Sequence, residues 1–151
     1  MTQLAVQFLH KLPPETAHNL ALKAISMGLA PGQKVEQTDM MRTTLWGMDF
    51  AHPLGLAAGF DKNAAAVEGL LDMGFAYVEV GTVTPKPQKG NAQPRLFRLR
   101  EDMALINRMG FNNDGVDTVV ANLKKVKHTH GHVGINIGCN KETEDRLADY
   151  T

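Results

Sequence analysis

The residues of this chain best suited to chemistry follow a short apolar run at positions 54–58. The run ends in small residues up to Gly59, and Asp61 and Lys62 add a carboxylate and an amine just beyond it. An apolar run of this length after Pro53 indicates a buried parallel strand. Small residues at its end let a flat ligand approach the backbone. Because α/β folds place their chemistry past the carboxyl ends of strands, this position is a candidate binding site.

Two later strands end in residues of the same kind. The run 76–80 is followed by Gly81 and Thr82, and the run 133–137 carries Asn136. The carboxyl ends of parallel strands in a barrel share one rim, so the three groups are expected to line one site. Taken singly, such residues are more often a turn glycine, a solvated lysine or a buried amide paired with backbone. Their repetition at successive strand ends is what favours a site.

The first forty residues are predicted to form a small helical hairpin. Apolar residues recur at helical spacing over 4–12 and again over 17–25. Pro13-Pro14 ends the first helix and begins the second, and Gly28 is the expected cap of the second. Residues 30–39 are rich in polar side chains and contain a Pro-Gly step, which indicates a linker.

The remainder of the chain alternates strand and helix patterns. The predicted elements are a short hairpin at 43–50, strands at 54–58, 76–80 and 133–137, a further strand at 96–99, and helices at 64–73, 116–126 and 142–150. Such alternation gives a parallel sheet, open or closed into a barrel. No G-x-G-x-x-G motif opens a helix, which argues against a dinucleotide-binding domain.

We therefore expect an α/β fold, namely the N-terminal part of a (β/α)8 TIM barrel preceded by a two-helix extension. The extension would comprise residues 1–40, and the first strands and helices of the barrel residues 41–151. A complete barrel takes roughly 250 residues. The chain, with 151 residues, is accordingly expected to be the front portion of a larger protein.

Composition excludes several classes of function. The 16 basic and 16 acidic residues give zero net charge, so no field would gather nucleic acid, and no nucleic-acid motif is present. A single cysteine rules out an internal disulfide, and no cysteine or histidine cluster has metal-site spacing, which suits a reducing cytosol. No secretory signal is expected at the N-terminus. No apolar run approaches the ~20 residues that span a bilayer.

Five segments of the sequence, in order, resemble one enzyme family. They are LGLAAGFDK at 54–62, EVGTVTPKPQ at 79–88, PRLFR at 94–98, INRMGFNN at 106–113 and GINIG at 134–138. Together they are similar to class 2 dihydroorotate dehydrogenases, the quinone-dependent flavoenzymes of pyrimidine synthesis. The resemblance covers residues 12–143. The segment LPPETAH at 12–18 is similar to the helical extension that separates class 2 from the shorter class 1 enzymes.

The resemblance implies three groups of site residues. Those expected to contact FMN are Ala57, Ala58, Gly59, Phe60, Asp61, Thr82 and Asn136. Those expected to hold dihydroorotate or its product orotate are Lys62, Asn107, Arg108, Met109, Gly110 and Phe111. A quinone is expected near His18 and Arg98. The catalytic base of the family is a serine expected beyond Thr151, so this chain would carry only part of the site. Cys139 stands where the family commonly has a lysine, and its role is left open.

The implied reaction is FMN-dependent oxidation of (S)-dihydroorotate to orotate, with a quinone as electron acceptor, on the path to UMP. The N-terminal helices would rest on a membrane surface, which places the protein peripherally on the cytoplasmic side of the inner membrane. Two alternatives stay open at this point. The chain could be an inactive truncated fragment, or it could belong to another FMN-barrel oxidoreductase such as a dihydropyrimidine dehydrogenase-like protein.

Overall fold

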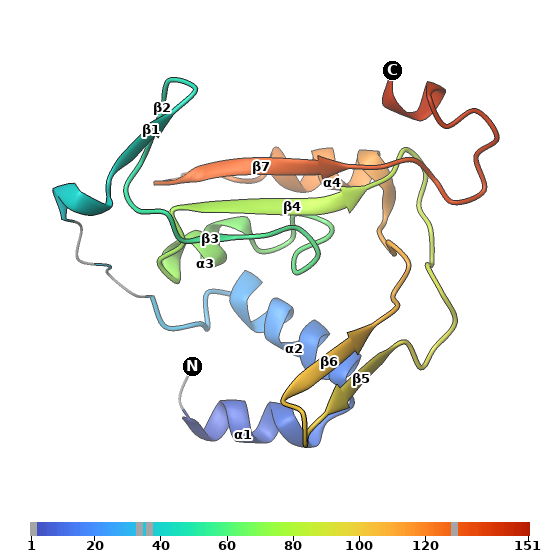
Figure 1. The fold of residues 1–151 in the computed structure, drawn as a ribbon, viewed down its shortest axis with the longest axis horizontal. Coiled ribbons are helices and arrows are strands. Elements are labelled where there is room, and N and C mark those ends of the chain that lie inside the picture. The colour runs from blue at the N-terminus through green and yellow to red at the C-terminus, as the bar shows by residue number, and fades with distance from the viewer. Residues whose placement is uncertain (1–2, 33–34, 36–37, 128–129) are drawn as a thin grey trace.

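A three-stranded parallel sheet forms the centre of the molecule. The structure, a computed structural model, describes residues 3–32, 35, 38–127 and 130–151. Strand β4 (Tyr77–Val83) lies between β3 (Gly55–Leu56) and β7 (His132–Ile137), as Figure 1 shows, and both neighbours run parallel to it. The pairing of β4 with β7 is regular up to Val80–Ile135. The next pair is Val83–Ile137, so β4 has an irregularity between Val80 and Val83. The predicted parallel arrangement of these three strands is confirmed.

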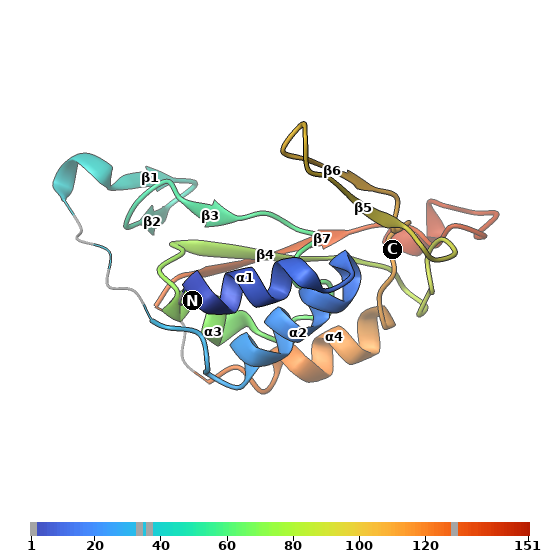
Figure 2. The ribbon, with the colours of Figure 1, turned by 90° about the horizontal axis from the view of Figure 1, so that it is seen from below.

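Helices α3 (Val67–Asp72) and α4 (Gly115–Leu123) lie on one face of this sheet (Figure 2). Alternate residues of β4 point toward them, which is the period expected of a strand with one face in a core. The buried apolar side chains of these three elements form one cluster: Val67, Leu70, Leu71, Val78, Val80, Val83 and Val119. Removal of this apolar surface from water fixes the sheet and therefore the positions of the strand ends.

The predicted helical hairpin is present as α1 (Gln3–Lys11) and α2 (Pro14–Ser26). Pro14 is the first residue of α2. An amide hydrogen at this position has no acceptor within the helix, so proline loses no hydrogen bond there. Helix α2 buries Ala17 and, near its end, Ile25, which joins the central core. Helix α1 buries none of its residues, and Figure 1 shows it on the far side of α2 from the sheet.

Two small antiparallel hairpins complete the structure. The predicted one consists of β1 (Thr43–Leu45) and β2 (Met48–Phe50) and follows the 3₁₀ helix η1 (Asp39–Met41). The further strand predicted at 96–99 is confirmed as β5 (Leu96–Leu99), and its partner is β6 (Ala104–Asn107). Strand β6 was not predicted, because all four of its residues are exposed and it therefore has no buried-face pattern.

Three elements differ most from the sequence prediction. Strand β3 has two residues rather than five, and α3 begins at Val67 rather than near 64, since the Asp61 carboxylate holds the preceding amides in a turn. The predicted helix at 142–150 is wrong: the structure has only the 3₁₀ helix η2 (Ala148–Tyr150) there. The Asp145 carboxylate accepts hydrogen bonds from the amides of Leu147 and Ala148, a local turn that competes with a helix.

Part of the predicted linker at 30–39 lies outside the described residues. Among the described residues, no helix has both the length and the apolar character needed to cross a bilayer.

Candidate active site

The carboxyl ends of β3 and β4 are joined by backbone hydrogen bonds. The Gly59 amide donates to the Gly81 carbonyl at 2.8 Å, and the Gly81 amide donates to the Asp61 carbonyl at 3.0 Å. Gly81 has a φ of +106°, and a Cβ at this position would collide with the Asn136 carbonyl on β7. Only glycine fits where three strands approach this closely. The predicted meeting of the strand ends at one rim is confirmed.

The side chains of β4 and β7 are joined at the same level. The Thr82 hydroxyl donates to Oδ1 of Asn136 at 2.6 Å. This bond fixes the orientation of the Asn136 amide. Its Oδ1 accepts from Thr82, and its NH2 group can donate to another acceptor. Among the described residues, no protein acceptor is found for that NH2 group.

A cavity of about 510 Å³ opens at this rim. The predicted site residues that line it are Ala58, Gly59, Lys62, Thr82, Asn107, Arg108, Met109, Gly110 and Phe111. The wall opposite the strand ends comes from the segment that follows β6. The structure therefore brings the predicted flavin-contact strands and the predicted substrate segment to one hollow, although Lys62 and Met109 are 47 positions apart in the sequence.

Lys62 brings an ammonium group to the lining of this cavity. Its Nζ donates to the Gly59 carbonyl at 2.7 Å and lies 3.8 Å from Sδ of Met109. Burial lowers the pKa of Lys62 from its ordinary value of 10.5, and repulsion from Arg95 lowers the pKa further. A lowered pKa means that the surroundings stabilise the charged ammonium less well than water does. An anionic ligand would therefore stabilise this ammonium. The electrostatics of the cavity therefore favour an anionic ligand.

The segment 107–111 folds back on itself to form the other wall. Oδ1 of Asn107 accepts the Met109 amide at 3.0 Å, and the Met109 side chain is buried. Arg108 turns away from the strand ends, because its Nη2 donates to the Pro94 carbonyl and its guanidinium lies 5.6 Å from the Phe97 ring centroid. Of the substrate residues expected from the sequence, Asn107 and Lys62 thus present the polar groups, and Arg108 supports the wall.

Four of the predicted flavin contacts lie beside the cavity rather than in its lining. Asp61 is fully buried, and its carboxylate accepts the amides of Asn63, Ala65 and Ala66, so it shapes the turn after β3. Phe60 packs edge-on against His18 with ring centroids 5.0 Å apart. The other two are Ala57, which is exposed, and Asn136, which reaches the rim through Thr82.

The two predicted quinone residues are in different places. His18 on α2 faces the strand-end turn through its contact with Phe60, and burial lowers the pKa of its imidazole, which favours the neutral ring. Arg98 on β5 donates to the carbonyls of Leu9 and Leu12, at the end of α1. Cations suit this position because the last carbonyls of a helix lack partners. Among the described side chains, no hydrogen bond or ring contact joins His18 to Arg98.

Sequence reasoning missed one lining residue, Asn91. Its amide donates to the Met109 carbonyl at 2.9 Å and its Nδ2 donates to the Arg108 carbonyl at 2.8 Å. Asn91 lies in the proline- and glycine-rich stretch between β4 and β5, which looks like an ordinary connection. A polar residue after a glycine in a long loop was the available signal, and it is a weak one.

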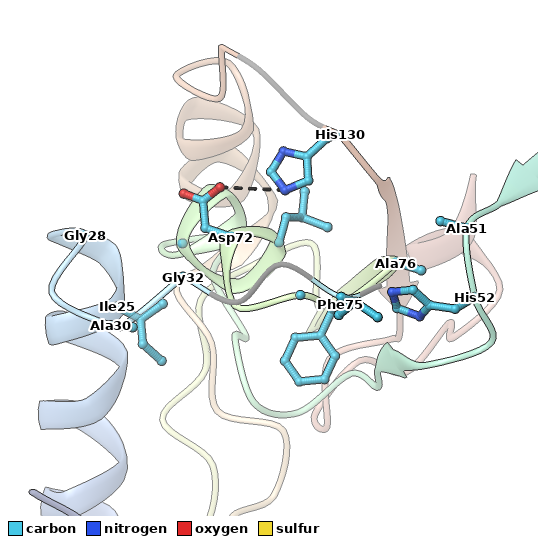
Figure 3. A pocket seen from close by; sticks show the side chains of 14 residues that line it. Ile25, Gly28, Ala30, Gly32, Ala51, His52, Asp72, Phe75, Ala76 and His130 are labelled. Atoms are coloured by element: carbon cyan, nitrogen blue, oxygen red, sulfur yellow. Dashed lines mark ion pairs between the residues drawn. The ribbon is translucent and has the colours of Figure 1, made fainter. Parts of the chain in front are cut away.

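A larger cavity, of about 740 Å³, lies at the other end of the sheet. Figure 3 shows it between the end of α2, the end of α3 and the starts of β3 and β4, with the His130–Asp72 pair at its edge. In barrel-like folds the amino ends of the strands serve stability and the carboxyl ends serve chemistry. The smaller cavity, with a half-buried lysine and convergent amides, is therefore the candidate active site.

The residues at the rim fit a flat cofactor such as FMN. Nothing lies within 4 Å of the position that a Cβ on Gly59 would take, so the backbone there is open to a planar ring. The Asn136 amide offers hydrogen-bond donors beside that open backbone, as a flavin ring edge requires. For metals the result differs: within residues 3–32, 35, 38–127 and 130–151, no group of three metal-ligating side chains comes together.

Comparison with known proteins gives a consistent result. Residues 40–151 match the family model described as dihydroorotate dehydrogenase. The chain is 51% identical over 148 residues to dihydroorotate dehydrogenase (quinone) of Rhodospirillum rubrum, and 50% identical over 139 residues to that of Rhizobium rhizogenes. These alignments cover 98% and 92% of this chain, and 40% and 38% of the relatives.

A solved structure agrees with the sequence matches. The crystal structure of DHODH from Eimeria tenella in complex with ferulenol superposes with a TM-score of 0.85 at 41% identity, covering 94% of this chain and 41% of that one. The chain thus spans about two fifths of the length of the proteins it matches. On the family model and these relatives together, the chain belongs to the dihydroorotate dehydrogenase family.

Proposed function

We propose that this chain supplies the N-terminal part of an FMN-dependent dihydroorotate dehydrogenase that passes electrons to a quinone in de novo pyrimidine synthesis. The family membership and the quinone-type names of the relatives support this proposal. The three parallel strands would be the first of a (β/α)8 barrel, and the α1–α2 hairpin would be its extension. Because the relatives are more than twice as long, the activity is proposed for the complete protein.

One observation carries the proposal: Lys62 and the segment 107–111 face a single cavity at the strand ends. Dihydroorotate is a small ring of amide groups with one carboxylate. Lys62 would bind the carboxylate, since it is half-buried and lacks a carboxylate within hydrogen-bond distance among the described residues. Asn107 and Asn91 would pair with the ring amides. One cation with amide side chains is the expected complement of such a molecule.

FMN, when bound, would take up the two electrons that the substrate loses on oxidation. The rim residues that would hold it are Ala58, Gly59, Thr82 and Asn136, with Phe60 and Asp61 fixing the turn behind them. The small side chains leave room for the ring, and the Thr82–Asn136 bond fixes the amide that would face it. These residues bind and orient; they do not move the substrate proton.

The proton acceptor is proposed to be a serine outside this chain, as the family resemblance implies. Thr82 is bonded to Asn136, and Thr84 is buried with its hydroxyl bonded to the Lys86 carbonyl, so both hydroxyls already have structural partners. Cys139 does not line the cavity, and its amide donates to the Tyr150 hydroxyl at 3.2 Å. This chain would therefore contribute binding and orientation to the reaction, and the remainder of the protein the base.

The quinone and the membrane are proposed to meet the protein at the helical hairpin. His18 and Arg98 lie on or against its helices. Leu4 and Phe8 of α1 are 77% and 56% exposed, and apolar side chains on an amphipathic helix are suited to the surface of a bilayer. The protein would then be peripheral, on the cytoplasmic side of the inner membrane.

The test uses a fusion protein, in which this chain is continued by the part of the Rhodospirillum rubrum relative that follows the aligned segment. We expect the purified fusion protein to bind FMN, to oxidise dihydroorotate and to reduce a quinone, all measurable by absorbance. We expect residues 1–151 alone not to oxidise dihydroorotate. A flavin-loaded fusion protein that oxidises dihydropyrimidines but not dihydroorotate would contradict the proposal in favour of the dihydropyrimidine dehydrogenase-like alternative.

A further inference from the structure

The side chain of Arg95, which precedes β5, joins three separate parts of the molecule. Arg95 is 8% exposed. Its Nε and Nη2 donate to the Glu15 carboxylate on α2, with an Nη2–Oε1 distance of 2.5 Å. Its Nη1 donates to the carbonyls of Lys89 at 2.6 Å and Asn91 at 2.9 Å, and reaches the Met109 carbonyl at 3.5 Å. A helix, a loop and the segment 107–111 therefore meet at one guanidinium.

Two of these three parts form a wall of the candidate active site. Asn91 and Met109 both line the cavity, and the Asn91 amide bonds the Met109 carbonyl. The contact is close: a Cβ on Gly90, whose φ is +71°, would collide with the Met109 carbonyl and lie 3.1 Å from Nη1 of Arg95. Because the loop and the segment pack this tightly, a shift of Arg95 must shift the cavity wall.

Glu15 holds the guanidinium from the other side. Its side chain is 16% exposed and that of Arg95 is 9%, so this pair is largely removed from water. A planar guanidinium can bond a carboxylate on one edge and carbonyl groups on another, which an ammonium cannot reproduce with the same geometry. Removing the Glu15 charge would leave Arg95 buried with only neutral acceptors, a state that favours movement toward solvent.

The same pair also affects Lys62. Burial is the main cause that lowers the pKa of Lys62; repulsion from Arg95 lowers it further, whereas attraction from Glu15 and Asp61 raises it. With Glu15 present, the charges of Glu15 and Arg95 partly cancel at the Lys62 ammonium.

We propose that Glu15 and Arg95 are positioning residues for substrate binding: their ion pair fixes the wall of the cavity formed by Asn91 and Met109 and ties that wall to helix α2. The inference rests on the proposed function and deepens it, because it assigns the affinity for the substrate partly to the helical hairpin. Arg95 acts on the substrate only through the backbone it bonds. If the ion pair only attached the hairpin to the rest of the protein, its loss would lower stability and leave substrate affinity unchanged.

The experiment compares Glu15→Gln and Arg95→Lys with a matched control, Arg100→Ala, in the fusion protein. Arg100 also donates to a helix carbonyl, that of His10 at 3.3 Å, but it does not line the cavity. The measurements are orotate titration by flavin absorbance, steady-state kinetics, and amide hydrogen exchange at Asn91 without ligand. Arg95→Lys keeps the charge, and Glu15→Gln keeps the size, so both variants are designed to fold.

We expect both variants to raise the dissociation constant for orotate and the KM for dihydroorotate by about tenfold, while kcat and FMN content change less than about twofold. Exchange at Asn91 should accelerate in both, and Arg100→Ala should match the wild type in orotate binding and exchange. A lowered melting temperature with orotate binding within about twofold of wild type would overturn the inference, because that is the result of mere attachment.

The hydrogen-exchange arm separates this inference from the proposed function. Unchanged exchange at Asn91 in Arg95→Lys would overturn the positioning role even if the fusion protein oxidises dihydroorotate normally. A wild-type fusion protein that fails to bind orotate would instead overturn the proposed function, and the positioning role with it.

Discussion

The sheet and the helical hairpin of this molecule are held by different kinds of contact. The sheet with α3 and α4 has a dense apolar core, in which Val78 and Val80 are fully buried. Helix α1 buries none of its residues, and the described contacts at its end are hydrogen bonds from Arg98 and Arg100 to its last carbonyls. The sheet is fixed by exclusion of water, whereas directional polar bonds hold the end of α1.

Helix α2 belongs to both regions, and this shows how the two are connected. Its end packs Ile25 into the core, where the Gly69 backbone of α3 lies directly against it. Its start carries Glu15, which bonds Arg95 beside the candidate active site. Apolar burial sets where the strand ends are, and polar contacts set what surrounds them. Deletion of α1 alone should therefore leave the flavin site intact.

The largest expected effect follows from deleting residues 1–12, which removes α1. In the fusion protein, we expect FMN to stay bound and dihydroorotate oxidation with a soluble dye to persist. Quinone reduction should be nearly abolished, because the proposed quinone site would lose one of its two helices. The measurement is the ratio of quinone-linked to dye-linked rates. An unchanged ratio with a normal KM for quinone would contradict the role given to the hairpin.

A pair of leucine variants tests the contrast in packing. Leu70→Ala removes a side chain that is 1% exposed in the core and should destabilise the protein by about 2–5 kcal/mol. Leu4→Ala changes a side chain on α1 that is 77% exposed and should alter stability by no more than about 0.5 kcal/mol. Thermal or urea unfolding of the fusion protein measures both. Equal destabilisation by the two variants would mean that the contrast is wrong.

A smaller and pH-dependent effect is expected at Glu15. The hydrogen bond from Arg95 lowers the pKa of Glu15 below its ordinary value of 4.5. A carboxyl whose pKa is lowered by folding stabilises the folded state above its unfolded pKa, and this contribution is lost as the pH falls through the folded value. The stability difference between wild type and Glu15→Gln, about 1–3 kcal/mol at neutral pH, should therefore shrink as the pH drops below 4.5.

The control for this prediction is Asp39→Asn, which breaks the exposed Asp39–Arg42 pair at 3.9 Å. Exposed ion pairs are screened by water and contribute little. We expect no measurable change in stability from this variant. A Glu15→Gln difference that is constant between pH 7 and about pH 3 would show that the buried pair contributes no charge-dependent stability.

The sequence predicted those features that depend on local pattern. Strands β4 and β7, the β1–β2 hairpin and both N-terminal helices follow from periodicity and from proline and glycine positions. The meeting of Gly59, Thr82 and Asn136 followed from a general property of parallel sheets. Residues 142–150 contradicted the pattern, because Asp145 bonds two nearby amides and stabilises a turn there instead of a helix.

Other features could not be predicted because their partners are far apart in the chain. The Glu15–Arg95 pair joins positions 80 residues apart, and nothing local marks either residue. Asn91 enters the cavity wall through two backbone groups of another segment. The role of Asp61 in its turn, rather than in the cavity lining, depends on which amides fold toward it. Such contacts are properties of tertiary structure.

The most direct test of the central claim, that the cavity holding Lys62 binds the substrate, is a titration of the FMN-loaded fusion protein with orotate. Lys62→Ala removes the cation of the cavity, and Lys124→Ala removes an exposed lysine just past α4 as the control. Loss of a hydrogen-bonded charged partner costs roughly 1.5–3 kcal/mol, so Lys62→Ala should weaken orotate binding by about 10- to 100-fold. Lys124→Ala should bind orotate as the wild type does. If Lys62→Ala retains wild-type affinity for orotate, the cavity is not the substrate site.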